Sequence, residues 1–329
     1  MNICLIDADS KIPNLALMKL STYHKLLGDK VTLYQANIPY YPNKKKKMFA
    51  APFGYDRYYC SVIFKGNDRY IFGNNIEYGG TGYDINKKLP EDADNCEPDY
   101  SIYPNNNASY GFISRGCIRN CSFCVVPIKE GYIRQVSTPK NIIRHDRVVF
   151  LDNNILALPD HKKVLLDVID CNVRCTFNQG LDIRLLDEEN AALIKKLKYI
   201  KEPCFAFDNY KLLSVIQHKV RILRAIGLTR VKFYVYVHPD MPLRDTISRI
   251  EYLRYERFLP YLMRDIKCWG SSYSDFFTDL ASWCNQPQFF KTQTFTEYIK
   301  RRVKSEDRAT QSSRLYTENT KLNAQYPLT

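Results

Sequence analysis

Long apolar runs are missing from this sequence of 329 residues. No stretch approaches the roughly 18–20 consecutive apolar residues of a membrane-spanning helix, so we expect no membrane partner. The first residues, Met1 to Asp9, also lack the basic start and apolar core of a secretory signal, and they carry acids instead. Disulfides are not expected among the eleven cysteines, because they persist mainly in secreted proteins. The sequence therefore predicts a cytoplasmic protein.

Acidic residues are fewer than basic ones: 35 Asp and Glu face 48 Lys and Arg, which gives a formal net charge of +13 at pH 7. This excess permits a polyanionic partner such as a nucleic acid or a nucleotide. The densest run of basic residues is Lys44–Lys47, but a lysine run in a loop is more often a solvated turn than a binding site. The 25 Tyr and 17 Phe residues offer rings for base stacking, although aromatic residues mostly fill cores. Charge alone does not establish a nucleic-acid partner.

A fourth cysteine is missing from the most distinctive motif, Cys117-Ile-Arg-Asn-Cys121-Ser-Phe-Cys124. No Cys or His follows this motif at zinc-ligand spacing, and a structural zinc ion needs four protein ligands. Cysteine thiolates are the usual ligands of a [4Fe–4S] cluster, and three of them leave one iron open to another ligand. Three incidental core cysteines are the alternative, which is disfavoured because the motif lies on a glycine-flanked loop.

The motif resembles the cluster loop of the radical S-adenosylmethionine (SAM) enzymes, C-x3-C-x-aromatic-C, with Phe123 at the aromatic place. The resemblance implies that Cys117, Cys121 and Cys124 hold a [4Fe–4S] cluster whose open iron binds the amino and carboxylate groups of SAM. It also implies that an electron, supplied by a flavodoxin- or ferredoxin-type reductant, cleaves SAM to methionine and a 5′-deoxyadenosyl radical. That radical would take hydrogen from a substrate that the sequence does not identify.

Residues 1–85 are predicted to form a small doubly wound, Rossmann-like domain that begins with a strand–helix–strand unit. It resembles the cobalamin-binding-like domain that precedes many radical SAM barrels. The signature of that family supplies a His to cobalt, whereas Asp7-Ala-Asp-Ser-Lys-Ile12 has none, so cobalamin is not supported by a ligand motif. Gly79-Gly-Thr-Gly82 predicts a tight turn where the backbone approaches something closely. A scaffold or substrate platform is the favoured role of this domain.

Residues 86–329 are predicted to form four further segments, and the fold class of the whole chain is predicted to be α/β. Residues 86–107 are turn-rich and are expected to be a linker. Residues 108–266 contain six strand–helix units, which indicates an open, partial (β/α)6 barrel of the TIM type, as in radical SAM enzymes. Residues 267–303 are predicted to be a helical extension. Residues 304–329 are polar, without a sustained apolar period, and are expected to be a flexible tail.

Chemistry in barrels of parallel strands takes place at the carboxyl ends of the strands, so polar residues there are the candidate site. By resemblance, Phe123 and the segment from Val125 to Pro127 would border the SAM adenine. Asp152 and Asn153 follow the second strand, where the superfamily places groups that bind the SAM amino group. A strand-ending turn is the alternative for these two residues.

The later strand ends supply the remaining candidates. Arg184 could pair with the SAM carboxylate and Asp182 could bind its ribose, but a structural ion pair between the two is the alternative. Gln179 precedes them at the end of the same strand. The groups predicted to face the substrate come from the later strands and are Asp208, Asn209 and His238.

Several reaction classes remain open at the level of sequence. A methylthiotransferase is disfavoured, because Cys4, Cys60 and Cys96 do not form the auxiliary cluster motif of that family and the C-terminal part is helical. A cobalamin-dependent methyltransferase acting on RNA or a small molecule lacks the His ligand. The alternative from another class is an iron–sulfur electron-transfer or nucleic-acid-binding protein.

Overall fold

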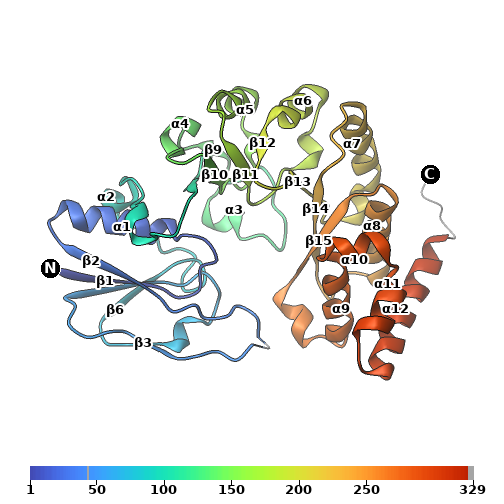
Figure 1. Ribbon diagram of the computed structural model, residues 1–329, viewed down its shortest axis with the longest axis horizontal. Coiled ribbons are helices and arrows are strands. Elements are labelled where there is room, and N and C mark those ends of the chain that lie inside the picture. Colours follow the sequence, from blue (N-terminus) through green and yellow to red (C-terminus); the bar gives the residue numbers. More distant parts are fainter. Residues whose placement is uncertain (43, 325–329) are drawn as a thin grey trace. The chain divides into compact units, whose positions relative to one another are not determined.

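The computed structural model describes residues 1–42 and 44–324, without the side chains of 321–324, and the chain divides at Gly111. Unit 1 runs from Met1 to Gly111 and unit 2 begins at Phe112. Both units combine parallel β-sheets with helices, so the predicted α/β class is confirmed (Figure 1). Within the described ranges, no helix has both the length and the apolar character needed to cross a membrane.

Unit 1 contains a four-stranded sheet in the order β2-β1-β4-β6. All neighbouring strands are parallel: β1 (Asn2–Asp7), β2 (Lys30–Gln35), β4 (Arg57–Ser61) and β6 (Ile76–Gly79). Five of the six residues of β1 are buried, which is typical of a central parallel strand. Helix α1 (Leu15–Leu26) begins at Asn14, whose side chain accepts a hydrogen bond from the Leu17 N–H. The predicted strand–helix–strand unit is therefore present.

Helices cover only one face of this sheet. On that face Ile3 and Leu5 pack against α1 and the short helix α2 (Glu91–Asp94). The other face buries Cys4 and Ile6 beneath loops and a two-stranded ribbon, β3 (Phe49–Ala50) and β5 (Ile71–Phe72). A doubly wound sheet carries helices on both faces, so that prediction is wrong for the described residues. The crossovers here are rich in Pro, Tyr, Asn and Gly, which favour turns over helices.

Residues 86–107, predicted as a linker, belong to unit 1. Ala93 of α2 is fully buried, and the 3₁₀ turn Tyr100–Ile102 leads to the buried residue Tyr103. The Tyr103 hydroxyl donates to Asp7 Oδ2 at 2.7 Å and accepts from the Asn14 N–H at 3.1 Å. Turn-rich composition suggested a linker, but a few buried polar contacts bind the segment to the sheet.

Unit 2 contains two sets of parallel strands. Strand β11 (Arg174–Phe177) lies between β10 (Arg147–Phe150) and β12 (Lys198–Tyr199), and β14 (Lys232–Val237) lies between β13 (Cys204–Ala206) and β15 (Leu259–Arg264). Leu181 bridges Phe205 in parallel, which links the two sets. All of these strands except β12 lie where the sequence predicts strands. Helix α4 (Pro139–Ile142) precedes β10, and the helices between the strands are α5 (His161–Asp170), α6 (Glu188–Lys196), α7 (Leu213–Ala225) and α8 (Leu243–Tyr255).

Strand β14 shows how these strands present a polar face. Phe233, Val235 and Val237 are fully buried, and the alternate residues Tyr234 and Tyr236 are only partly buried. Side chains alternate between the two faces of a strand, so one face joins the core and the other carries tyrosines. A parallel sheet is normally covered on both faces. A face that is only partly covered is therefore a candidate binding surface.

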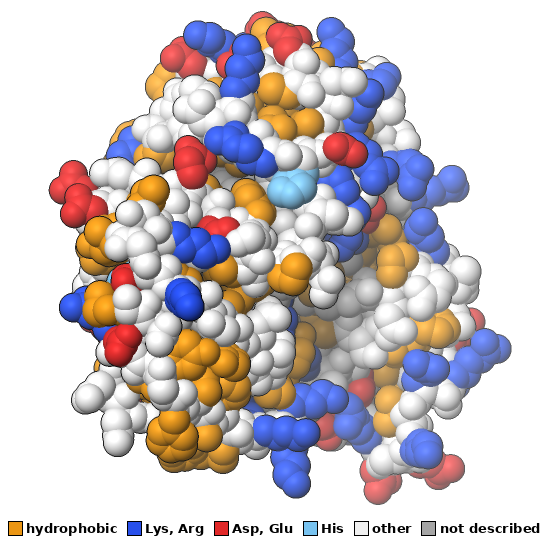
Figure 2. Space-filling model, turned by 60° about the vertical axis from the view of Figure 1, so that its left-hand side comes forward, with side chains coloured by type: hydrophobic (Ala, Val, Ile, Leu, Met, Phe, Trp, Pro, Cys, Tyr) orange, Lys and Arg blue, Asp and Glu red, His pale blue; other side chains and the backbone are white. Residues whose placement is uncertain are grey.

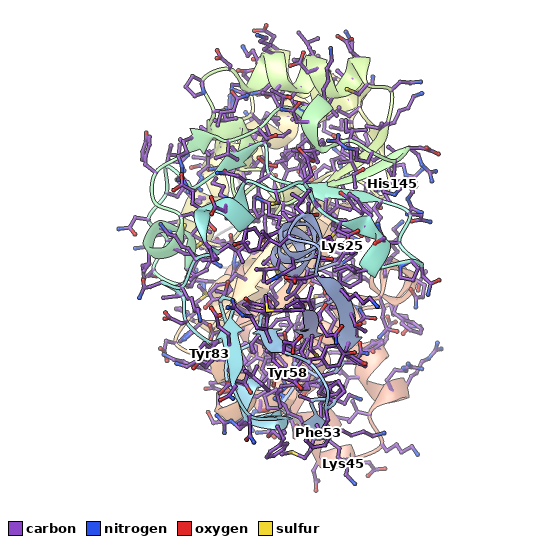
Figure 3. The ribbon with its side chains drawn as sticks, turned by 90° about the vertical axis from the view of Figure 1, so that its left-hand side faces the viewer. Lys25, Lys45, Phe53, Tyr58, Tyr83 and His145 are labelled. Atoms are coloured by element: carbon purple, nitrogen blue, oxygen red, sulfur yellow. The ribbon has the colours of Figure 1, made fainter. Side chains whose placement is uncertain are left out.

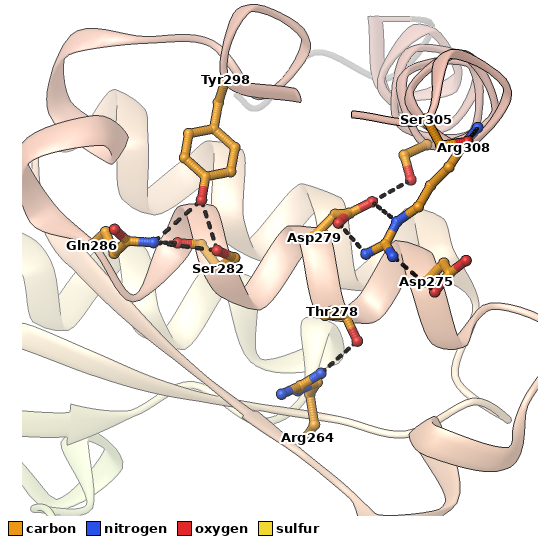
Figure 4. Close-up of polar contacts among 10 residues, drawn as sticks. Arg264, Asp275, Thr278, Asp279, Ser282, Gln286, Tyr298, Ser305 and Arg308 are labelled. Carbon is orange, nitrogen blue, oxygen red and sulfur yellow. Dashed lines mark hydrogen bonds and ion pairs between the residues drawn. The ribbon is translucent and has the colours of Figure 1, made fainter. Parts of the chain in front are cut away.

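Four helices follow the last strand: α9 (Ser274–Cys284), α10 (Pro287–Thr292), α11 (Phe295–Arg302) and α12 (Glu306–Ala324). The predicted helical extension is present, but the flexible tail is wrong for Glu306–Ala324. Arg308 of α12 binds the carboxylate of Asp279 (Figure 4). Ser312 of the same helix also donates to this carboxylate, with Oγ 2.9 Å from Oδ2. Tyr316 packs against Trp283 and Phe295 in the core. Residues 325–329 of the predicted tail lie outside the described residues.

Candidate functional site

The three cysteines lie on a loop whose ends are joined as a hairpin. Strand β7 (Ser109–Gly111) leads to β8 (Ser114–Arg115), which pairs in antiparallel fashion with β9 (Arg134–Gln135). We call the intervening residues 116–133 the cysteine loop. Its base is closed by Arg115, whose Nη1 lies 2.8 Å and 2.9 Å from the two carboxylate oxygens of Glu130.

Gly116 makes the first turn of the cysteine loop possible. Its φ is +86°, a conformation that other L-residues rarely adopt. A Cβ atom at this position would lie 2.3 Å from the Tyr132 carbonyl oxygen. The chain therefore needs glycine to bring the two ends of the loop together.

The end of β10 holds the start of the cysteine loop. Asp152 is 1% exposed, and its carboxylate accepts from Ser114 Oγ at 2.7 Å and from the Ile113 N–H at 3.3 Å. Burial raises the pKa of Asp152 to about 6. Asn153 Oδ1 accepts from the Gly116 N–H at 3.1 Å. The two residues predicted to bind a SAM amino group thus use these atoms to bind the chain itself.

The end of β11 holds the middle of the loop. Arg119 Nε lies 2.9 Å from Asp182 Oδ2, and Arg184 Nε lies 2.6 Å from Asp182 Oδ1. Burial would raise the pKa of Asp182, but hydrogen bonds from Arg184 and Arg119 outweigh it and hold this pKa below its ordinary value. The ion pair between Asp182 and Arg184, the structural alternative considered from sequence, is present.

The end of β14 holds the last part of the loop. The Phe123 ring stacks on the ring of Tyr236, with centroids 4.0 Å apart and planes inclined by 17°. Tyr236 is itself fixed, because its hydroxyl donates to Asp265 Oδ2 at 2.7 Å and its N–H donates to Asp208 Oδ1 at 2.9 Å. The predicted aromatic residue therefore has a partner that sequence reasoning did not name.

The thiols face polar groups from these strand ends. Cys117 Sγ accepts from the Arg119 N–H at 3.3 Å and from Asn154 Nδ2 at 3.4 Å. Burial raises the pKa of Cys121 and of Cys124, while the positive charge of Arg184 lowers that of Cys121. Within the described part of the chain, Asn154 Oδ1 is buried and has no hydrogen-bond partner. A buried acceptor of this kind is costly unless something donates to it.

The other predicted residues divide into two groups. Asp208 lies in the site beside Tyr236, and burial raises its pKa. His238 Nε2 lies 3.8 Å from Asp265 Oδ1, also at the carboxyl edge. Asn209 caps the 3₁₀ turn Tyr210–Leu212, with Oδ1 2.9 Å from the Lys211 N–H. The remaining three are more peripheral: Gln179 and Val125 are exposed, and Pro127 lies in the short helix α3 (Val126–Lys129).

The residues of the site that were not predicted include Arg119, Tyr236 and Asp265. The signal available for Arg119 was its positive charge within the cysteine loop of a chain with acids at its strand ends. Tyr236 lies on the partly open side of an alternating strand, but alternation alone does not select it from Tyr234. Asp265 directly follows the sixth strand and so satisfied the same rule as Asp208.

At the carboxyl edge of the sheet in unit 1, the acidic side chains are engaged by other groups of the chain. Asp7 accepts from Tyr103, and Asp9 accepts from the N–H groups of Ile63 and Phe64 at 2.8 Å and 3.1 Å. The predicted close approach of the glycine turn is to the chain itself, because a Cβ at Gly80 would lie 2.3 Å from the Val62 carbonyl oxygen. These residues do not fit cobalamin.

No group of three His, Cys, Asp or Glu side chains in the described ranges is placed closely enough to hold a metal ion. The chemistry of the cysteine loop nevertheless fits a thiolate-bound cluster, since its three thiols are free and the positive charge of Arg184 offsets part of the burial that raises the pKa of Cys121. The buried, unpartnered Asn154 oxygen also fits a ligand that brings N–H groups. Comparisons with protein-family models, with curated proteins and with solved structures gave no match to this chain.

Proposed function

We propose that this protein is a radical SAM enzyme whose [4Fe–4S] cluster is held by Cys117, Cys121 and Cys124. The observation that carries the proposal is the attachment of one three-cysteine loop to residues at the carboxyl ends of three strands, β10, β11 and β14. Asn153, Asp182 and Tyr236 each hold a different part of that loop. A loop of incidental cysteines would not require anchoring at β10, β11 and β14 together.

We further propose that the strands of unit 2 form the open, partial (β/α)6 barrel of this superfamily. The Leu181–Phe205 bridge supports this reading, because it joins the two parallel sets into one continuous order. The acidic groups of the site, Asp152, Asp182, Asp208 and Asp265, follow the carboxyl ends of these strands, as polar groups do in barrel enzymes. The proposal concerns the arrangement within unit 2 only.

When bound, the cluster would supply the electron that cleaves SAM to a 5′-deoxyadenosyl radical, after reduction by a flavodoxin- or ferredoxin-type partner. The chain's own groups would bind and orient SAM. Asn154 Oδ1 can accept from its ammonium group, and Arg184 can donate to its carboxylate. The exposed edge of Phe123, held by Tyr236, offers a surface for the adenine ring. The substrate remains to be identified.

The test is anaerobic reconstitution with iron and sulfide, followed by reduction in the presence of SAM. We expect about four irons per chain, a change in the cluster's EPR signal when SAM is added, and formation of 5′-deoxyadenosine. Cys117→Ala, Cys121→Ala and Cys124→Ala should each abolish all three. Cys171→Ala, a matched change at a partly buried cysteine outside the loop, should leave them intact. A cluster that forms normally but ignores SAM would favour the electron-transfer alternative.

A further inference from the structure

Two segments of unit 1 run side by side along the β3–β5 ribbon. Ala50 of β3 pairs with Phe72 of β5, and the Ala51 N–H donates to the Phe72 carbonyl at 2.7 Å. Before the ribbon, Lys46 Nζ lies 2.6 Å from Asn67 Oδ1, so the residues that precede the two strands are also neighbours. We call the exposed basic and aromatic side chains of these two segments the ribbon surface. It consists of Lys44, Lys45, Lys47, Phe53, Lys65, Arg69 and Phe72.

Positive charge is concentrated on the ribbon surface. The segments 44–53 and 65–72 contain six basic residues and one acidic residue, Asp68. Burial, and after it the charge of Arg69, lowers the pKa of Lys46, which indicates that cations crowd together here. Figure 2 shows a face of the molecule on which Lys and Arg side chains gather beside hydrophobic ones. Such a field attracts a polyanion.

Exposed aromatic rings lie beside these charges. Phe53 is 98% exposed, at the tip of a Pro52-Phe53-Gly54 turn in which Gly54 has a φ of +91°. Phe72, at the end of the neighbouring strand, is 49% exposed. In Figure 3, Lys45 and Phe53 are labelled at the same end of the view. A Phe side chain left in water is unusual, because its burial is favourable by about 1.5–3 kcal/mol.

We propose that the ribbon surface binds single-stranded nucleic acid. Lysines would neutralise phosphates, and the rings of Phe53 and Phe72 would stack on bases, which only an unpaired strand exposes. At roughly 3.3 Å per residue, the six steps along the chain from Lys47 to Phe53 span at most about 20 Å, which suits a short run of nucleotides. This inference goes beyond the radical SAM proposal and does not rest on it, because all the residues belong to unit 1.

The probe is a fluorescein-labelled 12-nucleotide oligo(U), titrated with the full-length, metal-free protein and followed by anisotropy at several KCl concentrations. We expect binding that weakens steeply with salt. Phe53→Ala should weaken binding about 5- to 100-fold, in line with a stacking contribution of about 1–3 kcal/mol per base. Lys44→Gln with Lys45→Gln should reduce the slope of log K against log [KCl] by about 0.7 per lost phosphate contact.

Matched controls come from unit 2. Tyr255→Ala removes another highly exposed ring, and Lys163→Gln with Lys196→Gln removes two exposed lysines, so these variants should bind like the unchanged protein. Several outcomes would overturn the proposal: absence of oligo(U) binding, equal effects of control and ribbon variants, or tighter binding to a 12-base-pair duplex. Binding to vesicles of anionic lipid in place of oligo(U) would also overturn it.

Discussion

Asp152 shows how much one buried carboxylate contributes to the candidate site. It accepts hydrogen bonds from Ser114 and from the Ile113 N–H, so it fixes the strand that leads into the cysteine loop. The same burial that makes these bonds strong raises its pKa to about 6. Its protonation state is therefore linked to the stability of the folded chain.

We expect Asp152 to make the folded chain more stable at pH 4 than at pH 6. Its pKa is higher in the folded than in the unfolded state, so the folded chain binds the proton more tightly, and stability falls as pH rises between about 4 and 6. A shift of about two units corresponds to about 3 kcal/mol. Asp152→Asn should remove this dependence and cost about 1.5–3 kcal/mol at pH 7, where the charged hydrogen bonds are lost.

Urea unfolding at pH 4, 5, 6 and 7 measures this effect. Asp146→Asn, at an exposed carboxylate just before β10, is the control and should change neither the stability nor its pH dependence. If the Asp152→Asn variant kept the full difference between pH 4 and pH 6, another group would be responsible.

Sequence reasoning reached some residues of the site but not their partners. The spacing and the interleaved Phe123 were sufficient to locate the cysteine loop. The placement of acids at strand ends was sufficient to bring Asp152, Asp182 and Asp208 into consideration. Which atoms they contact depends on side-chain directions between strands far apart in sequence, and periodicity does not contain that information. Asp152 was therefore assigned to a ligand, although its oxygens hold Ser114.

At the scale of the element, the polar helix α12 illustrates why low hydrophobicity is a poor guide to disorder. Its sequence has no sustained apolar period, yet Tyr316 enters the core and Arg308 binds Asp279, which is only 5% exposed at its side chain. A few specific contacts hold a helix that an amphipathic pattern would not have found. The strands were predicted more successfully, because β14 and its neighbours carry alternating or continuous apolar residues.

We expect Asp279→Ala to loosen α12. The change leaves Arg308 and Ser312 without their shared acceptor, and breaking a buried ion pair is costly. Because Arg308 is 32% exposed, we expect a loss of about 2 kcal/mol, below the usual cost for a fully buried pair. Hydrogen exchange should accelerate throughout α12 and change little in β14.

The neighbouring pair provides the control for this change. Asp275 also binds Arg308, at 3.2 Å, but it is 68% exposed, so Asp275→Ala should cost less than about 0.5 kcal/mol. Equal protection of α12 in the Asp279→Ala variant and the unchanged protein would contradict the role given to this contact.

At the scale of the whole molecule, the chain is divided into two units with separate cores. Chains of this kind often unfold in more than one step. Turn residues in 86–107 suggested a boundary near residue 85, whereas the buried Tyr103 places this segment inside unit 1. Turn-rich composition therefore did not reveal that residues 86–107 belong to unit 1.

We expect calorimetry to resolve two unfolding transitions. Tyr103→Phe removes the buried hydrogen bond to Asp7 Oδ2 and should lower only the transition of unit 1, by about 1–3 kcal/mol. Asp279→Ala should lower only the transition of unit 2. A single transition that both variants displace equally would show that the two cores unfold together.

The hairpin-closed cysteine loop has a consequence for the durability of the proposed enzyme. Asn153, Asp182 and Tyr236 anchor the loop through contacts within the chain, so we expect its shape to persist when the proposed cluster is lost. Small zinc domains, in contrast, unfold when their metal is removed. If oxygen destroyed the cluster, the loop would keep the conformation that binds it. Repair would then require new iron and sulfide but no refolding of the chain.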